Sequence, residues 1–360
     1  NFRVPGIGLE ADDGILSIKT GSGSVAEARF YCESSNAHYV AIKSPAHSAY
    51  SGNVSFVLPP NGGTNGYFLK TDGSGNTSWA EAGGGVDSDA QQNTVAGTDA
   101  GGSFSGTSAY RNTLLGYRAG RDITTGDYNN FFGAFAGAET TTGHRNIAIG
   151  SETLFNNTSG TQNIAIGTEA LMATETSGDN VAIGRRAGYS TLQSSNTYIG
   201  TDSAYKMKNA GYNVAIGSKA MFGVDDAEGD KNIAIGYESM ENLSSGDSNI
   251  AIGYYAMSGS TLTGDNNIAI GNEAGENLTS GGYNICIGNQ AGEEITTAYS
   301  NICIGRNTGD DITTGGSNTL VGAYAGGALT TGASNVVLGA SALGTATTGF
   351  GNVAIGESAM

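Results

Sequence analysis

Cysteine and histidine are common zinc ligands, and Cys32, His38 and His47 fall within one short stretch of the chain. Spacings of six and nine residues separate them, and these match no compact ligand motif. The third histidine, His144, stands alone in the sequence. We therefore expect neither a metal site nor a cofactor.

Catalytic patterns are also missing. The chain has no G-x-S-x-G turn and no glycine-rich phosphate loop followed by lysine. Paired carboxylates can cleave glycosidic bonds, and Asp127, Asp179 and Asp247 recur in G-D turns. Solvated aspartate is common in turns, and the nonapeptide typical of calcium-binding β-rolls is absent. We interpret these residues as structural and expect that the chain is not an enzyme.

The charge of the chain narrows the range of partners. Its formal net charge is −17, which argues against binding to nucleic acid or to an anionic membrane, because both need clustered Lys and Arg. No run of about 18 apolar residues exists that could cross a bilayer. We therefore expect no nucleic-acid partner and no membrane insertion.

A fixed period dominates the chain from Asn112 onward. A phrase that most often reads N-I-A-I-G returns at fourteen intervals, of which eleven are 17 residues and the others 16, 19 and 18. Such a period is typical of a solenoid, in which each rung packs only on its neighbours. We predict an all-β fold in which a parallel β-roll or β-solenoid of about 17-residue rungs follows a small β-rich module. The phrase starts at Asn112, Asn129, Asn146, Asn163, Asn180, Asn196, Asn213, Asn232, Asn249, Asn267, Asn284, Asn301, Asn318, Asn335 and Asn352.

Positions within a rung are numbered here from its Asn. Counting a weaker copy at Asn93, position 5 is Gly in all sixteen rungs, which suggests a backbone conformation closed to other residues. Position 8 is always Ala, Ser or Thr, and position 12 is often Ile or Leu followed by T-T-G, which predicts a second short strand. The predicted structural positions are represented by Asn146, Ile149, Gly150, Asn232, Ile235, Gly236, Asn284, Ile287 and Gly288.

The asparagine at position 1 has two interpretations. It could form a ladder of stacked amides along the rod, or it could close a turn in a conformation that Asn tolerates. Both roles are structural.

We infer that the strand at positions 2 to 4 is buried on both faces. Position 4 is Ile, Leu, Val or Phe in every rung after the first, so we expect it to face a core. Position 3 is never charged and is often bulky, although adjacent strand residues point to opposite faces. A coil this short encloses little more than one layer of side chains. We therefore expect the second face to pack on other copies, with three chains around one axis.

The N-terminal region lacks the repeat. We divide the chain into a small β-rich module at 1–80, a glycine-rich linker at 81–92 and a repeat shaft at 93–360, in which 93–111 is a capping rung and 112–360 are regular rungs. The strands predicted in the module are Ile15–Lys19, Ala28–Cys32, His38–Ile42, Val54–Leu58 and Tyr67–Lys70.

The phrase V-A-I-G, followed by small residues, resembles the head repeats of trimeric autotransporter adhesins of the YadA type. This resemblance covers about residues 93 to 360 and implies a left-handed parallel β-roll assembled from three chains. It differs in detail, because those adhesins usually have one more residue between the Asn and V-A-I-G and a shorter coil.

A second resemblance covers both parts of the chain. The stretch from Gly66 to Trp79, with A-R-F-Y-C at Ala28 and P-A-H at Pro45, is similar to segments of tail-fibre proteins of tailed bacteriophages, which also carry N-x-A-I-G arrays. It implies an extracellular virion fibre whose partners are further copies of itself, other tail proteins and a glycan or protein receptor on the host. A bacterial adhesin head is the alternative, and a glycan-cleaving tailspike is the least favoured.

Tyrosines gather in the variable turns. Aromatic rings beside polar groups suit contact with sugar or protein, which makes Tyr117, Tyr237, Tyr254 and Tyr255 candidate receptor contacts. The alternative is that these rings pack over the edges of the rungs.

Overall fold

The computed structural model describes residues 27–31, 39–43, 59, 67–72, 77–81, 89–104 and 108–360. The chain divides into two compact units, Asn1–Gly84 and Gly85–Met360. Every regular element in the described residues is a β-strand. The predicted all-β class is therefore confirmed.

Two antiparallel strand pairs form the described part of the first unit. Strand β1 (Glu27–Tyr31) pairs with β2 (Tyr39–Lys43), and β3 (Tyr67–Thr71) pairs with β4 (Thr77–Glu81). This confirms the predicted small β-rich module and shows that its strand pairs are antiparallel.

Three of the five strands predicted in this unit correspond to β1, β2 and β3. Strand β4 was not predicted, because only one residue of its T-S-W-A-E sequence, Thr77, is β-branched. The predicted strands at 15–19 and 54–58, and the zinc candidates Cys32, His38 and His47, lie outside the residues whose side chains the structure describes.

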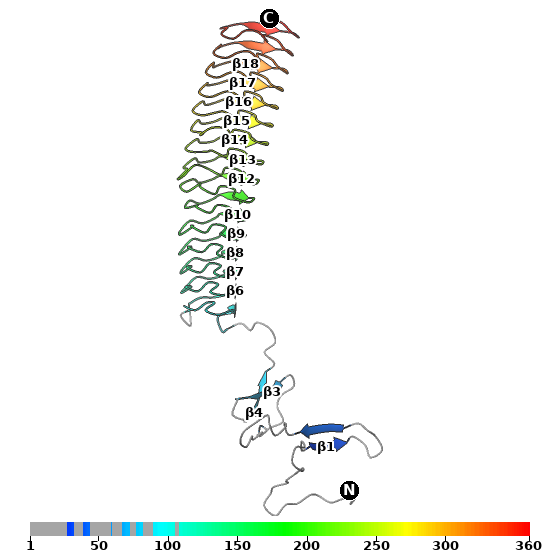
Figure 1. Ribbon diagram of the computed structural model, residues 1–360. Helices are drawn as coiled ribbons and strands as arrows, with labels where there is room; N and C mark the ends of the chain where they lie inside the picture. The colour runs from blue at the N-terminus through cyan, green and yellow to red at the C-terminus, as the bar shows by residue number, and fades with distance from the viewer. Residues whose placement is uncertain are drawn as a thin grey trace, which may run out of the picture. The chain divides into compact units, whose positions relative to one another are not determined.

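The second unit is a solenoid whose rungs each contribute one three-residue strand to a 16-stranded parallel sheet (Figure 1). Sequential strands are neighbours throughout this sheet, which confirms the parallel β-solenoid with rungs of about 17 residues. The strands are β5 (Thr94–Ala96), β6 (Thr113–Leu115), β7 (Asn130–Phe132), β8 (Ile147–Ile149), β9 (Ile164–Ile166), β10 (Val181–Ile183), β11 (Thr197–Ile199), β12 (Val214–Ile216), β13 (Ile233–Ile235), β14 (Ile250–Ile252), β15 (Ile268–Ile270), β16 (Ile285–Ile287), β17 (Ile302–Ile304), β18 (Thr319–Val321), β19 (Val336–Leu338) and β20 (Val353–Ile355).

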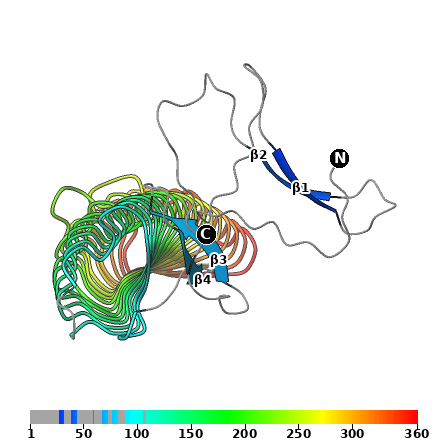
Figure 2. The same cartoon turned by 90° about the horizontal axis from the view of Figure 1, so that it is seen from below.

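Equivalent positions stack directly on one another along the sheet. In β13 and β14, for example, Ile233 pairs with Ile250 and Ala234 with Ala251. Figure 2 looks along the stack and shows successive rungs lying over one another, each slightly displaced from the last. Each structural residue therefore forms a column that runs along the solenoid.

The asparagines of position 1 form a buried ladder. The backbone N–H of Asn284 donates to Oδ1 of Asn267 at 3.0 Å, and its Nδ2 donates to the same oxygen at 3.1 Å. The same Nδ2 also donates to the carbonyl of Ala298 at 2.8 Å, at the turn that completes the rung. The two interpretations of this residue therefore hold together, since one amide both links neighbouring rungs and closes a turn.

The glycines of position 5 form a second column. Gly288 has a φ of 139°, and a Cβ on it would lie 2.3 Å from the carbonyl oxygen of Gly305 in the next rung. An alanine here would have a backbone conformation that L residues avoid and would also clash with main-chain atoms. Position 5 is therefore glycine for two independent steric reasons.

The core lies inside the coil, where side chains of positions 3, 8, 9 and 12 meet. In many rungs a large side chain at position 3 is accompanied by a small residue at position 9, or the reverse. Phe131 accompanies Gly137, and a Cβ on that glycine would lie 2.3 Å from the Phe131 ring. Ala165 accompanies Leu171, and both are fully buried. Where both positions are small, as with Ala182 and Gly188, neighbouring rungs fill the space, because a Cβ on Gly188 would lie 2.6 Å from the Tyr198 ring.

Two predictions about the rung are wrong. Position 4 does not face the core of its own coil, because Ala148 at position 3 is fully buried whereas Ile149 at position 4 is 40% exposed. Pleating sends the single middle residue of the strand inward and its two neighbours outward. The segment after position 12 forms isolated bridges, such as Leu243 with Leu262, rather than a second regular strand.

Removing one whole rung should leave a folded, shorter solenoid, because the rungs on either side of the deletion can stack with equivalent residues in register. We expect deletion of 284–300 to preserve β-structure and a cooperative melting transition by circular dichroism. Deletion of only eight residues from the same rung should abolish both, because it breaks every column. Equal tolerance of the two deletions would contradict the stacking described here.

Replacing Asn284 by Ala should destabilise the solenoid by about 3 kcal/mol, because it leaves buried groups without partners at roughly 1 to 3 kcal/mol each. The orphaned groups include the backbone N–H of Asn301, which donates to Oδ1 of Asn284 at 3.0 Å. Chemical denaturation measures the change. The exposed Asn289 of the same rung is the matched control, and its replacement by Ala should change the free energy of unfolding by less than about 0.5 kcal/mol.

Candidate functional site

Three of the four candidate tyrosines lie together on adjacent rungs. The ring of Tyr254 lies 5.5 Å from that of Tyr237 and 4.2 Å from that of Tyr255, measured between centroids. Tyr237 and Tyr254 are 43% and 47% exposed. Tyr117 lies apart from them, edge-on to Phe135 at 5.2 Å. These rings pack over rung edges, and a role in receptor contact stays a prediction.

A buried carboxylate lies beside the tyrosine cluster. The Nζ of Lys219 donates to Oε1 of Glu238 at 2.7 Å, and the Glu238 side chain is only 8% exposed. Burial alone would raise the pKa of Glu238, but hydrogen bonds from Lys219, Tyr237 and Tyr255 lower it overall. The bond to Glu238 is also the main cause that raises the pKa of Lys219. The lowered pKa of Glu238 and the raised pKa of Lys219 both indicate that the two side chains form an ionised pair. This pair holds the tyrosine cluster in place.

The outward face of the long sheet is mostly apolar, with Thr or Asn only at position 2 of β6, β7, β11 and β18. Positions 2 and 4 of β6 to β20 form two columns that we call the outer stripe, and none of its side chains is charged. Ile149, Ile183, Ile270 and Ile304 of the stripe are 36% to 40% exposed. Monomeric proteins rarely leave an extended, largely apolar face in water, and parallel sheets are normally covered on both faces. The outer stripe therefore has the character of an interface.

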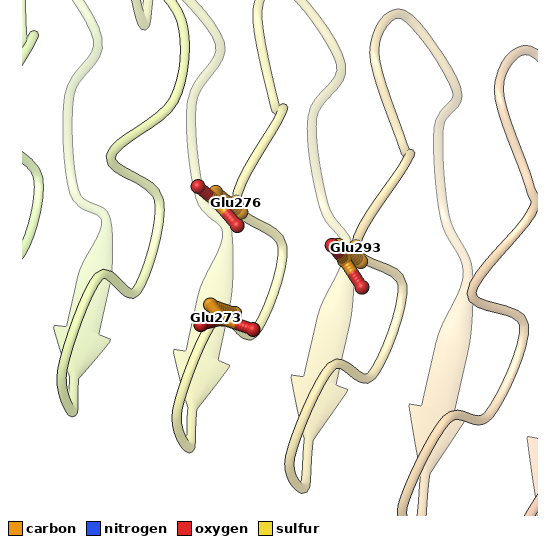
Figure 3. A group of neighbouring side chains, drawn as sticks. All are labelled: Glu273, Glu276 and Glu293. Carbon is orange, nitrogen blue, oxygen red and sulfur yellow. The ribbon is translucent and has the colours of Figure 1, made fainter.

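An acidic cluster lies on two adjacent rungs of the solenoid. One carboxylate oxygen from each of Glu273, Glu276 and Glu293 lies within 4.8 Å of the others (Figure 3). Burial, followed by repulsion from neighbouring carboxylates, raises the pKa of Glu276 and of Glu293. Glu273 also accepts a hydrogen bond from Nε2 of Gln290 at 2.9 Å. Calcium takes six to eight oxygen ligands, so three carboxylates do not define a calcium site.

The aspartates of the G-D turns have structural partners. Oδ1 of Asp127 accepts the backbone N–H of Tyr110 at 2.7 Å, and Oδ1 of Asp247 accepts that of Asp230 at 2.7 Å. Asp179 accepts a hydrogen bond from Nε2 of Gln162. Each carboxylate thus binds the preceding rung.

A groove on the side of the solenoid was not predicted from the sequence. It encloses about 460 Å³ and is lined by residues from Asn156 to Asp226, which belong to five consecutive rungs. Two rungs of unusual length fall in this region, since the intervals that begin at Asn180 and Asn213 are 16 and 19 residues. That irregularity is the sequence signal that marks the groove.

None of the described residues forms a helix that is long and apolar enough to cross a membrane.

The Glu238 pair should make the stability of the shaft depend on pH. The pKa of Glu238 is lower in the folded state than its ordinary value of 4.5. The stability that the ionised Glu238 provides is therefore fully present above pH 4.5 and is lost as the pH falls through the folded-state pKa. We expect Glu238→Gln to lower the free energy of unfolding at about pH 7 and to have a much smaller effect at about pH 3. Chemical denaturation at both pH values measures this. Glu228→Gln, at an exposed side chain, is the control, and an equal loss at both pH values would contradict the assignment.

No protein-family model, no curated protein and no solved structure matches this chain.

Proposed function

We propose that this chain forms the rigid shaft of a homotrimeric fibre on the tail of a bacteriophage, where it holds an attachment surface away from the particle. The observation that carries the proposal is the outer stripe, an uncharged face that runs from β6 to β20. Its side chains are only partly covered by their own coil. Packing against further copies would remove them from water, which is the dominant driving force for association.

The width of the stripe favours three chains. It is only two side chains wide, because the buried Asn of position 1 and the Gly of position 5 end it on either side. Three narrow faces can meet around one axis and cover each other in a closed assembly. At about 4.8 Å per rung, fifteen stacked strands would extend roughly 70 Å.

The role of such a shaft is mechanical. Its columns of hydrogen bonds and tightly packed glycines resist bending, and three linked chains would combine weak contacts into firm attachment. The partners in this proposal are other tail proteins and a glycan or protein receptor on the host, and the location is the virion. The V-A-I-G repeat keeps a bacterial surface adhesin head as the second candidate.

Sedimentation equilibrium tests the assembly. We expect a mass three times the 36.3 kDa of one chain. The double variant Ile235→Asp, Ile252→Asp places two charges in the outer stripe and should give folded monomers, with circular dichroism reporting on β-structure. The control is Glu228→Lys, at an exposed side chain outside the stripe, which should keep the trimer. A monomeric or dimeric wild-type protein would refute the trimer.

The place of the fibre requires a separate measurement. Electron microscopy of intact phage particles labelled with an antibody to this chain should show the label on tail appendages. Label on bacterial cells that carry no phage would support the adhesin head instead.

A further inference from the structure

The regular repeat gives the shaft a uniform side, and the groove lies where that regularity fails. The backbone N–H of Val224 donates to the carbonyl of Leu243 at 3.0 Å, and that of Glu228 donates to the carbonyl of Ser244 at 2.8 Å. Leu243 and Ser244 are consecutive, so this rung has extra residues between Val224 and Glu228. Ala227 stays in register, since it is buried and bridges Met207 of the preceding rung, whereas Asp225 and Asp226 are exposed and form a loop. This loop forms one end of the groove.

The loop is attached to the rest of the groove by two exposed ion pairs. Nζ of Lys206 lies 2.9 Å from Asp225, and Nζ of Lys208 lies 2.9 Å from Asp226. The aspartate side chains are 89% and 69% exposed. Exposed pairs of this kind contribute little to stability, so both ammonium groups can exchange their partner for a ligand oxygen.

Polar groups follow one another along the groove. Its lining takes Asn156, Glu175, Ser190, Lys206 and Asp225 from successive rungs, which are about 4.8 Å apart. These side chains offer hydrogen-bond donors and acceptors in mixed order, and their charges nearly cancel. An extended, hydroxyl-rich chain could bond to one rung after another, whereas a strongly charged ligand would meet groups of both signs.

Apolar surface accompanies the polar groups. Ala173 and Leu192 also line the groove. Beside it the ring of Tyr205 lies 5.0 Å from that of Tyr189 and 5.3 Å from that of Phe222. The stack borders the groove at the lining residue Lys206, whose Nζ lies 5.5 Å from the centroid of the Phe222 ring. Half-buried rings next to hydrogen-bonding groups suit a ligand that has both C–H faces and hydroxyls.

We propose that this groove binds a linear oligosaccharide. The hydroxyls of successive sugars would bond to the polar groups of successive rungs, and their C–H faces would contact Ala173, Leu192 and the aromatic stack. The assignment rests on the proposed attachment role, for which it supplies the class of receptor and the place on the shaft.

An array of linear oligosaccharides tests the proposal, followed by calorimetry with the best-bound sugar. We expect saturable binding by the wild-type protein. Ala173→Trp fills the groove and should weaken binding at least about tenfold. The matched control is Ala328→Trp, at the same position of a distant rung, which should change the affinity by less than about twofold.

The assignment would be overturned if no oligosaccharide on the array is retained, or if Ala173→Trp binds as tightly as the wild type. A protein receptor that Ala173→Trp blocks, in the absence of sugar binding, would also overturn it. Circular dichroism checks that both variants fold. Sedimentation of the same samples tests the trimeric shaft separately from sugar binding. A trimer that binds no sugar would contradict only the oligosaccharide site, and a monomer that binds sugar would contradict only the trimer.

Discussion

The structure depends on the buried asparagine ladder. A 17-residue coil has too small an interior to fix the register of its neighbours by packing alone. The amide of position 1 fixes it with hydrogen bonds, since each Oδ1 accepts from the next rung and each Nδ2 closes its own turn. A shift by one residue would orphan buried polar groups in every rung and would turn the outer side chains inward. The ladder therefore determines which residues form the core and which form the outer stripe.

Much of this architecture could be predicted from the sequence, because in-register stacking makes the same residue type necessary at the same position of every rung. Gly at position 5 and small residues at position 8 report close backbone contacts, and Ile123 or Leu278 at position 12 lies in the core. The direction of position 4 could not be predicted, because both faces of the strand are apolar and the pattern does not say which one is inside. Position 3 indicates the inward face more clearly, because a large residue there, such as Phe131, is accompanied by Gly at position 9 of the same coil.

Other features were concealed by variable residues. Position 7 has a positive φ in all sixteen rungs but is occupied by residues such as Arg118, Glu152 and Tyr255. Left-handed backbone costs such residues roughly 1 to 2 kcal/mol each, so the stacked neighbours must impose it, and no residue preference reveals it. The groove was concealed in the same way. Its lining residues form no motif, and only the uneven intervals after Asn180 and Asn213 point to it.

The asparagine ladder also has a direction. Within each pair of neighbouring rungs, the acceptor oxygen belongs to the rung nearer the N-terminus and the donor N–H groups belong to the rung that follows, as with Asn284 and Asn301. A finished rung thus presents a fixed acceptor to the next segment of chain. Because a ribosome releases the chain in the same order, each newly made rung meets a completed template and the solenoid can grow during translation without waiting for its C-terminus.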